Sequence, residues 1–432
     1  MPKSEYLKFG GYLEPRFRPG WERFIICTFR LEPAKGAKFA EAAVAVAAES
    51  SIGTWTELIT LTQKMKDNLA AKVFYLDPKS KIIKIAYPLR LFELGNLPQF
   101  LSGCAGNIFS MKIVDHLRLE DVYFPKKYVN SFLGPRFGIP GIRKILKIYN
   151  RPLVGAIVKP KLGLSAAGHA MCAYDCFRGG VDLVKDDENL TDQDFNHFTK
   201  RVKLTLALAK KAEIKTGEKK VCAFNVTAPT SEMIKRAKYI KKMGGTCAMI
   251  DIVSTGFSSI QELRAQNLGL IIHGHRAGHS TFTRSKNQGI AMSVIAHLSR
   301  LAGIDQLHTG TVVGKMEGEK SEVTDIDNLL KEDWGHFHSL KEDLSKIKPV
   351  MPIASGGLHP ALTPRLMKIL GKDLIINFGG GIHGHPDGTY AGAKAARASV
   401  EAAMSHIPLE KFAETRPELK VALDYWKNKS NL

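Results

Sequence analysis

The chain has few cysteines and no long apolar run. Its six cysteines are scattered through 432 residues and lie mostly in apolar segments, which argues against a disulfide framework or a clustered zinc site. Cys172 and Cys176 stand one helical turn apart, a spacing more typical of two buried small residues than of a ligand pair. No hydrophobic stretch could span a bilayer, and the first residues lack the apolar segment of a secretory signal. We therefore expect a cytoplasmic protein with no membrane partner.

Acidic residues are fewer than basic ones, whereas the aromatic content suits a soluble globular protein with a substantial core. Asp and Glu total 42 against 62 Lys and Arg, which gives a formal net charge of +20, and aromatic residues make up 8%. The densest basic stretches, 200–220 and 235–242, look like the polar faces of amphipathic helices. Because no nucleic-acid-binding motif accompanies them, we expect no nucleic-acid partner. A basic surface of this kind could still steer a polyanionic small substrate.

The first 133 residues mix helices with strands that can pair antiparallel. The pattern predicts strands at 24–30, 55–60, 71–76, 82–87 and 115–121, and helices at 39–48 and 97–103. That order predicts a small ferredoxin-like α+β domain over residues 1–133.

From residue 134 to 432, short β-branched runs alternate with amphipathic helices. Eight strands are predicted, at 154–158, 181–184, 221–226, 247–253, 270–273, 306–308, 350–354 and 374–378. Helix starts are predicted at Ser165, Thr191, Ser231 and Ser259, the last with Glu262 completing a capping box. Eight strand–helix units over roughly 280 residues predict an α/β fold, a (β/α)8 TIM barrel with further helices at its carboxyl end. A doubly wound open sheet is the alternative, because a sequence cannot show closure.

Ionisable residues or glycines follow six of the eight predicted strands. They stand at Lys159–Lys161, Lys185–Glu188, His273–Arg276, His308, Ser355–Gly357 and Gly379–Gly381, and a glycine-flanked loop carrying Lys315 follows His308. Barrel enzymes place their chemistry at the carboxyl ends of the strands. One polar strand end is ordinary, but six facing one mouth predict an active site.

The segment Lys185-Asp-Asp187-Glu188 predicts a site for a hard cation. Side chains alternate along a strand, so Lys185 and Asp187 project to the same side, with Glu188 close behind. Mg²⁺ favours several carboxylate oxygens that converge on one point. The alternative is a solvated turn whose acids favour the start of a helix. The polar ends of the other strands favour the metal site.

The glycine runs after the seventh and eighth strands predict a phosphate site. Glycine lets backbone N–H groups approach an anion closely, and barrels commonly bind phosphate there. Arg276 and His308 are further candidate phosphate ligands, although Arg276 could equally form a salt bridge that holds a loop. The match of residues 379–384 to Gly-x-Gly-x-x-Gly is weak evidence for a dinucleotide site, because it falls in the last unit. His273 and His275 lack a third zinc ligand, so we expect His273 to be structural.

Taken together, these motifs resemble the large subunit of ribulose-1,5-bisphosphate carboxylase/oxygenase (RuBisCO). The resembling segments are Gly155–Gly163, Gly180–Asn189, His273–Ala277, His308–Gly318 and Ser355–Gly357, with Ala47–Trp55 and Gly106–Phe109 in the amino-terminal region. They cover nearly the whole chain in order. The short termini are most similar to those of the archaeal (type III) enzymes, which lack a small subunit. The resemblance implies a homodimer, or an oligomer of dimers, whose active sites are shared between subunits.

The resemblance also implies which residues perform the chemistry. Lys185 would be carbamylated by CO₂ and would hold Mg²⁺ together with Asp187 and Glu188, and its carbamate would take the C3 proton. Carbamylation requires the neutral amine, so we expect the site to depress the pKa of this lysine. Lys159, supported by Lys161, would handle protons on the enediol and at the final carbanion.

Further roles are implied for residues on other strands and in the amino-terminal region. His275 would assist proton movement at the C3 hydroxyl, and Lys315 would stabilise the carboxylate formed from CO₂. Glu49 and Asn107 would come from a second subunit. The phosphate ligands would be Arg276, His308 and Ser355 at one end of the substrate, and Thr54, Trp55, Gly357, Gly379 and Gly380 at the other.

The implied reaction converts ribulose 1,5-bisphosphate, CO₂ and water into two 3-phosphoglycerates, with O₂ as a competing substrate, in nucleotide (AMP) salvage and CO₂ fixation. One departure is Ile382-His383-Gly384, where many carboxylases have a threonine–leucine pair. That ending also looks like some RuBisCO-like proteins, which enolise a sulfur-containing sugar phosphate in methionine salvage. An enolase or isomerase of this kind is the alternative function, and a basic scaffold or nucleic-acid binder is the non-enzymatic alternative.

Overall fold

The structure, a computed structural model, describes residues 11–56, 58–313, 320–337 and 340–429. The chain forms two compact units. Unit 1 comprises Met1–Leu133, Gly278–Ala302 and Glu332–Ile347, and unit 2 comprises Gly134–Ala277, Gly303–Lys331 and Lys348–Leu432. Two segments from the carboxyl-terminal part of the sequence therefore fold with the amino-terminal unit. Among the described residues, no helix combines the length and the apolar character needed to cross a bilayer.

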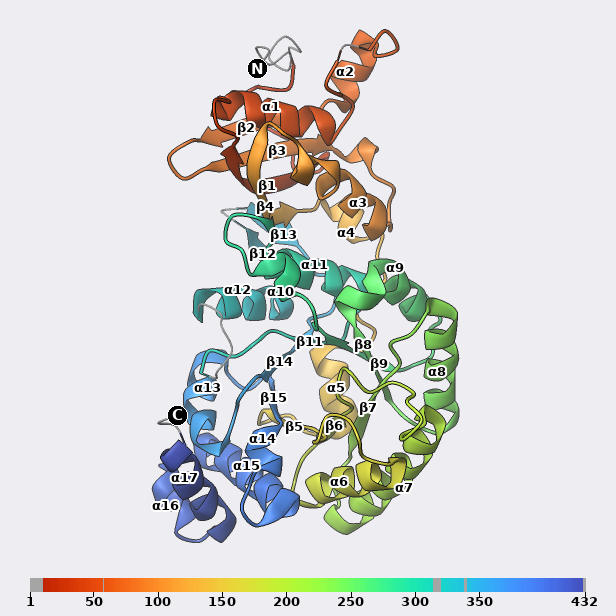
Figure 1. Ribbon diagram of the computed structural model, residues 1–432, viewed down its shortest axis with the longest axis vertical. Coiled ribbons are helices and arrows are strands. Elements are labelled where there is room, and N and C mark those ends of the chain that lie inside the picture. The colour runs from red at the N-terminus through yellow and green to blue at the C-terminus, as the bar shows by residue number, and fades with distance from the viewer. Residues whose placement is uncertain (1–10, 57, 314–319, 338–339, 430–432) are drawn as a thin grey trace. The chain divides into compact units, whose positions relative to one another are not determined.

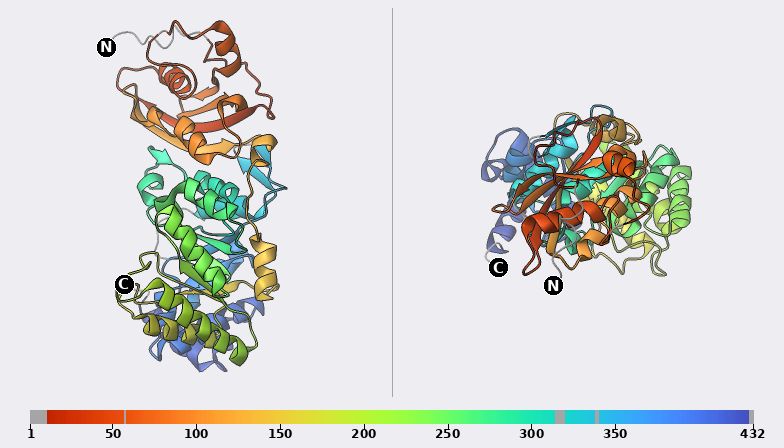
Figure 2. Two further views of the ribbon diagram at one scale, coloured as in Figure 1. Left: turned by 90° about the vertical axis from the view of Figure 1, so that its right-hand side faces the viewer. Right: turned by 90° about the horizontal axis from the view of Figure 1, so that it is seen from above.

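Unit 1 is built on a five-stranded sheet in the order β10-β4-β1-β3-β2. Its strands are β1 (Phe24–Pro33), β2 (Lys72–Asp77), β3 (Ile82–Pro88), β4 (Val114–Tyr123) and β10 (Gly289–Ile290). β1 pairs antiparallel with β3 and β4, and β10 runs parallel to β4. Helix α1 (Phe39–Glu49) lies on one face of this sheet, and its small residues from Ala42 to Ala48 are all buried (Figures 1 and 2). Small side chains let the helix approach the sheet closely.

The remaining elements of unit 1 are short helices and one further ribbon. The helical segments are α2 (Gln63–Leu69), η2 (Leu89–Leu91), α3 (Leu97–Cys104), η3 (Asn107–Ser110), α4 (Lys126–Val129), α10 (Ser280–Thr283) and α11 (Met292–Ala302). The ribbon pairs β12 (Trp334–Phe337) antiparallel with β13 (Leu340–Asp343).

Unit 2 is a closed barrel of eight parallel strands, which confirms the predicted TIM barrel. Around the barrel the order is β11-β14-β15-β5-β6-β7-β8-β9. The strands are β5 (Leu153–Ile157), β6 (Leu183–Lys185), β7 (Val221–Asn225), β8 (Cys247–Asp251), β9 (Ile271–His275), β11 (Gln306–His308), β14 (Met351–Ser355) and β15 (Ile375–Phe378). Pairing of β15 with β5 closes the ring, so the open-sheet alternative is wrong.

Helices flank these strands (Figure 1). Those of unit 2 are α5 (Gly138–Leu146), α6 (Ala166–Arg178), α7 (Phe198–Thr216), α8 (Thr230–Lys242), α9 (Ile252–Ala265), α12 (Lys320–Lys331), η4 (Pro360–Leu362), α13 (Thr363–Leu370), α14 (Gly380–His383), α15 (Gly388–Met404), α16 (Leu409–Ala413) and α17 (Pro417–Lys429).

An apolar core fills the amino-terminal end of the barrel. It gathers the first residues of the strands, such as Leu153, Leu183 and Ile271, with Ile142 and Leu146 of α5. Helix α5 therefore closes this end, which leaves the carboxyl ends of the strands for polar residues.

Three local predictions are wrong. Residues 55–56 and 58–60 form turns and coil instead of a strand, and Trp55 and Ile59 are 70% and 104% exposed, so no neighbouring strand buries them. Thr191 does not start a helix, because its N–H bonds to Gln193 and α7 begins only at Phe198. Ser259 lies inside α9 and bonds to Thr230 at 2.6 Å instead of capping.

Candidate active site at the carboxyl ends of the barrel strands

Lys185 ends β6 and is fully buried at the centre of the polar residues. Its Nζ donates to the carbonyl of Asp186 at 2.8 Å and lies 3.5 Å from Glu188 Oε2. Burial lowers the pKa of Lys185, even though the charges of Glu188 and Asp187 act to raise it. Removing an ammonium from water costs more than the two carboxylates, a buried Asp187 and a partly exposed Glu188, return here. This is the direction that carbamylation of the lysine requires.

The acids after Lys185 point to different partners. Asp187 Oδ2 accepts from Lys159 Nζ at 2.6 Å, and its Oδ1 accepts from the Asn189 amide at 3.0 Å. Burial alone would raise the pKa of Asp187, but these two donors lower it below its ordinary value. Burial also acts to raise the pKa of Glu188, but the charges of Lys185 and His275, together with a backbone hydrogen bond, lower it overall. Both carboxyls are therefore held as anions beside a buried amine.

Asp186 is turned away from this cluster. Its carboxylate pairs with buried Arg201 at 3.1 Å and with His169 at 3.2 Å, and it accepts the Asn225 N–H at 2.9 Å. The alternation of side chains along a strand explains the separation. Asp186 fixes β6 to its neighbours, while Lys185 and Asp187 remain with the functional cluster.

His275 ends β9 and approaches two carboxylates. Its Nε2 lies 3.5 Å from Glu188 Oε2, and its Nδ1 lies 3.2 Å from Asp251 Oδ1. The Ala277 N–H points at the same Nδ1, at 3.1 Å. Because that N–H can only donate, the neutral ring carries its proton on Nε2, on the side of Glu188.

His273 and His308 form a buried pair behind His275. Their Nε2 atoms are 3.0 Å apart, and His273 Nδ1 lies 2.9 Å from Gln306 Oε1. Burial lowers the pKa of His273 to about 3 and that of His308 well below its ordinary value. Both rings are therefore neutral at physiological pH. The expectation that His273 is a hydrogen-bonded structural residue is confirmed.

Arg276 is a desolvated cation that forms no ion pair in the described part of the chain. No side-chain hydrogen bond of Arg276 occurs there either, and burial lowers its pKa to about 10, although the charge of Glu322 acts to raise it. A Cβ at Gly310 would lie 2.6 Å from its Nη2, so glycine leaves room for the guanidinium. The alternative was that Arg276 holds a loop by a salt bridge. The described residues form no such salt bridge. An arginine without a counterion favours an anionic ligand.

Glycines follow Ser355 on β14 and Phe378 on β15. Gly357 has φ +70°, which favours glycine. A Cβ at Gly380 would meet nothing within 4 Å, whereas one at Gly379 would lie 3.5 Å from Lys159 Cε. The Gly379–Gly380 backbone is therefore open beside Lys159, as a phosphate seat requires.

The remaining predicted residues lie elsewhere. Lys161 is exposed just after β5, and Lys315 falls outside the described residues. Glu49, Thr54, Trp55 and Asn107 belong to unit 1, where Glu49 ends α1 and Asn107 begins η3, two elements in contact.

Two residues near the cluster were missed by the sequence analysis. Asn225 ends β7 and donates to the Glu188 carbonyl at 2.9 Å, and Asp251 ends β8 beside His275. The predicted strands ran on to residues 226 and 253, so both polar residues were counted as strand interior. Their polarity within apolar runs was the available signal.

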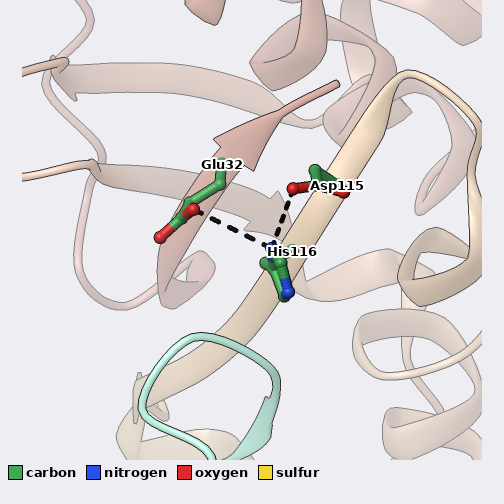
Figure 3. Close-up of side chains that lie close together, drawn as sticks. All are labelled: Glu32, Asp115 and His116. Atoms are coloured by element: carbon green, nitrogen blue, oxygen red, sulfur yellow. Dashed lines mark ion pairs between the residues drawn. The ribbon is translucent and has the colours of Figure 1, made fainter. Parts of the chain in front are cut away.

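Unit 1 contains the one group of at least three His, Cys, Asp or Glu side chains that, among the described residues, lie close enough to share a metal ion. Ligand atoms of Glu32, Asp115 and His116 lie within 4.8 Å of one another (Figure 3). Glu32 and His116 are cross-strand partners, and a register shift next to this pair places Asp115 on the same side. Glu32 also pairs with Lys81 at 2.9 Å. Exposed cross-strand ion pairs account for this group, and we assign it no metal.

Comparison with known proteins covers both units. The model of the ribulose bisphosphate carboxylase large chain N-terminal domain matches residues 11–128, and that of the catalytic domain matches residues 138–426. A ribulose bisphosphate carboxylase of Methanosarcina mazei is 50% identical over 427 residues, covering 97% of this chain and 99% of the relative. One of Pyrococcus abyssi is 46% identical over 430 residues, covering 99% and 98%.

Solved structures agree with these matches. The octameric ribulose-1,5-bisphosphate carboxylase/oxygenase of Pyrococcus horikoshii, crystallised with sulfate, superposes with a TM-score of 0.91 at 44% identity, covering 97% of this chain and 96% of that one. A dimeric archaeal Rubisco from Hyperthermus butylicus gives 0.92 at 41% identity, covering 98% and 99%. The chain therefore belongs to the ribulose bisphosphate carboxylase large-chain family, of the archaeal type.

Proposed function

We propose that the chain is a Mg²⁺-dependent ribulose-1,5-bisphosphate carboxylase/oxygenase, activated by CO₂ and located in the cytoplasm. It converts ribulose 1,5-bisphosphate, CO₂ and water into two 3-phosphoglycerates, and O₂ competes with CO₂. The observation that carries the proposal is Lys185, an amine buried between Asp187 and Glu188 whose pKa is lowered. The family of the chain supports the same conclusion.

The residues present fit carbamylation and a magnesium ion. A neutral Lys185 amine would attack CO₂: the nitrogen–carbon bond forms as one carbon–oxygen π bond opens, and loss of a proton from the nitrogen to solvent leaves a carbamate anion. Together with Asp187 and Glu188, the carbamate completes a set of oxygen donors that suits Mg²⁺. When bound, the ion would supply positive charge that polarises the substrate's carbonyl and hydroxyl oxygens.

The protein's own groups would then move the protons. The Lys185 carbamate takes the proton from C3, and His275 exchanges one with the C3 hydroxyl at Nε2. Lys159, held at 2.6 Å by Asp187, delivers protons to the enediol and the final carbanion, with Lys161 in support. Lys315 stabilises the new carboxylate. Fixed donors of this kind contribute because they need not reorganise during the reaction.

The two phosphates define the ends of the substrate. Arg276, His308 and Ser355 bind one of them: Arg276 forms no ion pair in the described chain, although the charge of Glu322 acts on it, and His308 is a neutral ring. Gly357, Gly379 and Gly380 bind the other through backbone N–H groups. Thr54, Trp55, Glu49 and Asn107 come from the unit 1 of a second subunit. The functional assembly is a homodimer or an oligomer of dimers without a small subunit, and the bisphosphate comes from nucleotide salvage.

The test is incubation of the purified protein with labelled bicarbonate, Mg²⁺ and ribulose bisphosphate. We expect labelled 3-phosphoglycerate, and its loss in Lys185→Ala by at least about 10³-fold, because both the base and a metal ligand disappear. Lys210→Ala, at an exposed lysine on α7, is the matched control. Lys315→Ala should still exchange the C3 proton while losing carboxylation. Turnover of the methionine-salvage substrate without labelled phosphoglycerate would instead establish the enolase alternative.

A further inference from the structure

Cys172 lies on α6 beside the proposed site, yet no step of the reaction uses it. Its Sγ is 3.7 Å from His383 Nδ1 and 3.8 Å from the carbonyl oxygen of Lys159. His383 ends α14, the short helix that follows the Gly379–Gly380 backbone. The thiol therefore touches the two elements that carry Lys159 and the glycine seat.

The ring of His383 is oriented to accept the thiol proton. Its Nε2 lies 2.9 Å from the carbonyl oxygen of Ile157, which can only accept, so Nε2 carries the hydrogen. In the neutral ring Nδ1 is then unprotonated, and Nδ1 is the atom that faces Cys172 and, at 3.1 Å, Thr389 Oγ1. A nucleophile next to a base that is itself held by a third group is the arrangement of an activated thiol.

Cys176, one turn further along α6, also favours the thiolate form of Cys172. Its hydrogen bond to Cys172, followed by that of His383, lowers the pKa of Cys172 to about 4 against the effect of burial. The pKa of Cys176 is raised well above its ordinary value. The pair therefore holds one thiolate, on Cys172, and one thiol, on Cys176.

Neighbouring charges do not change this assignment. On α6 itself, Asp175 acts on Cys176 and not on Cys172. α7 and α15 also pack on α6, and there Lys211 and Lys394 lie over the rings of Tyr174 and Tyr390. The segment after β5 presents the carbonyl of Lys159.

Cys172 is the cysteine that a reagent in solution can reach. All six cysteines are free, and Cys27, Cys104, Cys176, Cys222 and Cys247 are buried, whereas Cys172 is partly exposed. A small reagent in solution can therefore reach one thiolate per chain.

We propose that Cys172 is a nucleophilic thiolate and a site of reversible modification by small disulfides, through which the neighbouring site is switched off. The thiolate attacks one sulfur of the disulfide, the S–S bond breaks, and a mixed disulfide forms on Cys172. The departing thiolate takes a proton from water. Cys172 sulfur is oxidised and the leaving sulfur is reduced, so no other oxidant is needed.

The inhibitory effect rests on the proposed function. A group attached to Cys172 occupies the space next to His383 and displaces the ring from the Ile157 carbonyl. Ile157 is the last residue of β5, two positions before Lys159, and His383 ends the helix of the glycine seat. Displacement of His383 thus disturbs both a proton donor and a phosphate ligand.

The reactivity of the Cys172 thiolate is tested on the full-length protein with Ellman's reagent, an aromatic disulfide. This measurement does not depend on enzyme activity. We expect one thiol per native chain to react rapidly and no fast phase in Cys172→Ser, while Cys222→Ser, a buried cysteine, behaves like the wild type. The rate should be nearly constant from pH 5.5 to 7.5, whereas for an ordinary thiol it rises about 100-fold over those two units. The double variant Cys176→Ala/His383→Leu, which lacks both side chains that lower the pKa of Cys172, should restore a steep pH dependence. A steep profile in the wild type, or no reactive thiol, would overturn the proposal.

The regulatory part is tested by assaying carboxylation before and after the same treatment. We expect treatment to abolish most turnover, dithiothreitol to restore it, and Cys172→Ser to remain active and insensitive. Full turnover of the thiolated wild type would overturn the switch. Absence of turnover in the untreated, reduced protein would instead contradict the proposed function, while the labelling rates would still report on the thiolate.

Discussion

At the scale of single residues, the feature that matters most is a lysine in a place where its charge is costly. Lys185 is 0% exposed, and its two neighbouring carboxylates do not restore its ordinary pKa. A site built only for stability would hold an apolar residue here. The lowered pKa is useful to an amine that has to react with CO₂, because only the neutral form is a nucleophile.

Replacing Lys185 by methionine should remove a pH-dependent penalty on folding. The folded protein holds the lysine at a pKa below the 10.5 of the unfolded chain, so between the two values the unfolded chain binds more protons. Stability of the wild type should therefore rise with pH as it approaches 10.5, at most by about 1.4 kcal/mol per pH unit from this group. Lys185→Met should lack that rise.

The measurement is urea unfolding from pH 7 to 10 in buffer without CO₂ and Mg²⁺. Lys210→Met, on an exposed side chain, should keep the wild-type slope. Identical slopes for the wild type and Lys185→Met would show that the buried amine is not the source of the pH dependence.

Asp251 is the acid that faces His275 from β8. Its Oδ1 is buried, lies 3.2 Å from His275 Nδ1 and has no hydrogen bond. We expect Asp251→Asn to lower kcat by about 10-fold with little change in KM, since the negative charge stabilises a protonated His275 while a proton moves. Steady-state kinetics over pH 6 to 9 would check this. An unchanged kcat with a raised KM would mean that Asp251 shapes the binding of substrate instead.

At the scale of elements, α5 determines which end of the barrel is available for chemistry. Ile142 is 0% exposed among the first residues of the strands. Ile142→Ala should cost about 2–5 kcal/mol of unfolding free energy, because the close-packed end cannot collapse around the missing atoms. Ile145, on the same helix but only partly buried, is the control, and its change to alanine should cost clearly less. Equal losses in urea unfolding would argue against α5 as the closing element.

The barrel was predictable because each of its strands is a short apolar run next to an amphipathic helix, and both signals are local. The hairpin of β12 and β13 was not, because residues 332–347 carry many charges and fold with the other unit instead of beside their sequence neighbours. The late start of α7 has a similar cause. Arg201 binds the carbonyls of Thr191 and Asn196 and holds the preceding segment as a loop.

In the site, too, local features were predictable from the sequence and contacts between distant segments were not. Lys159, Lys185 and His275 stand out in the sequence as charged or polar residues after apolar runs, and the structure brings them to one end of the barrel. Contacts between the ends of neighbouring strands, such as that of Lys159 after β5 with Asp187 after β6, depend on which strands pair and have no sequence signal. The partner of Cys172 is 211 residues away at His383, so the spacing of the cysteines alone favoured the interpretation of two buried small residues.

At the scale of the whole molecule, the proposed site draws on both units. Lys159, Lys185, His275 and Arg276 are in unit 2, whereas Glu49, Thr54 and Asn107 are in unit 1. Both units match the same family, and the two solved relatives described above are a dimer and an octamer. In the dimer that we propose, two-fold symmetry would place unit 1 of each subunit against the barrel of its partner once, which gives two equivalent shared sites per dimer.

Mixing two inactive variants distinguishes a shared site from a site within one chain. Glu49→Gln and Lys185→Ala should each be inactive as homodimers. In a hybrid dimer with shared sites, one site combines both defects and the other is intact. Random mixing makes half of the dimers hybrid, so about a quarter of the wild-type activity should return. If each site were built within a single chain, every site in the mixture would carry one defect and no activity would return. The control is a mixture of Lys185→Ala with Asp187→Ala, both in unit 2, which should stay inactive if unit 2 supplies both residues to one site.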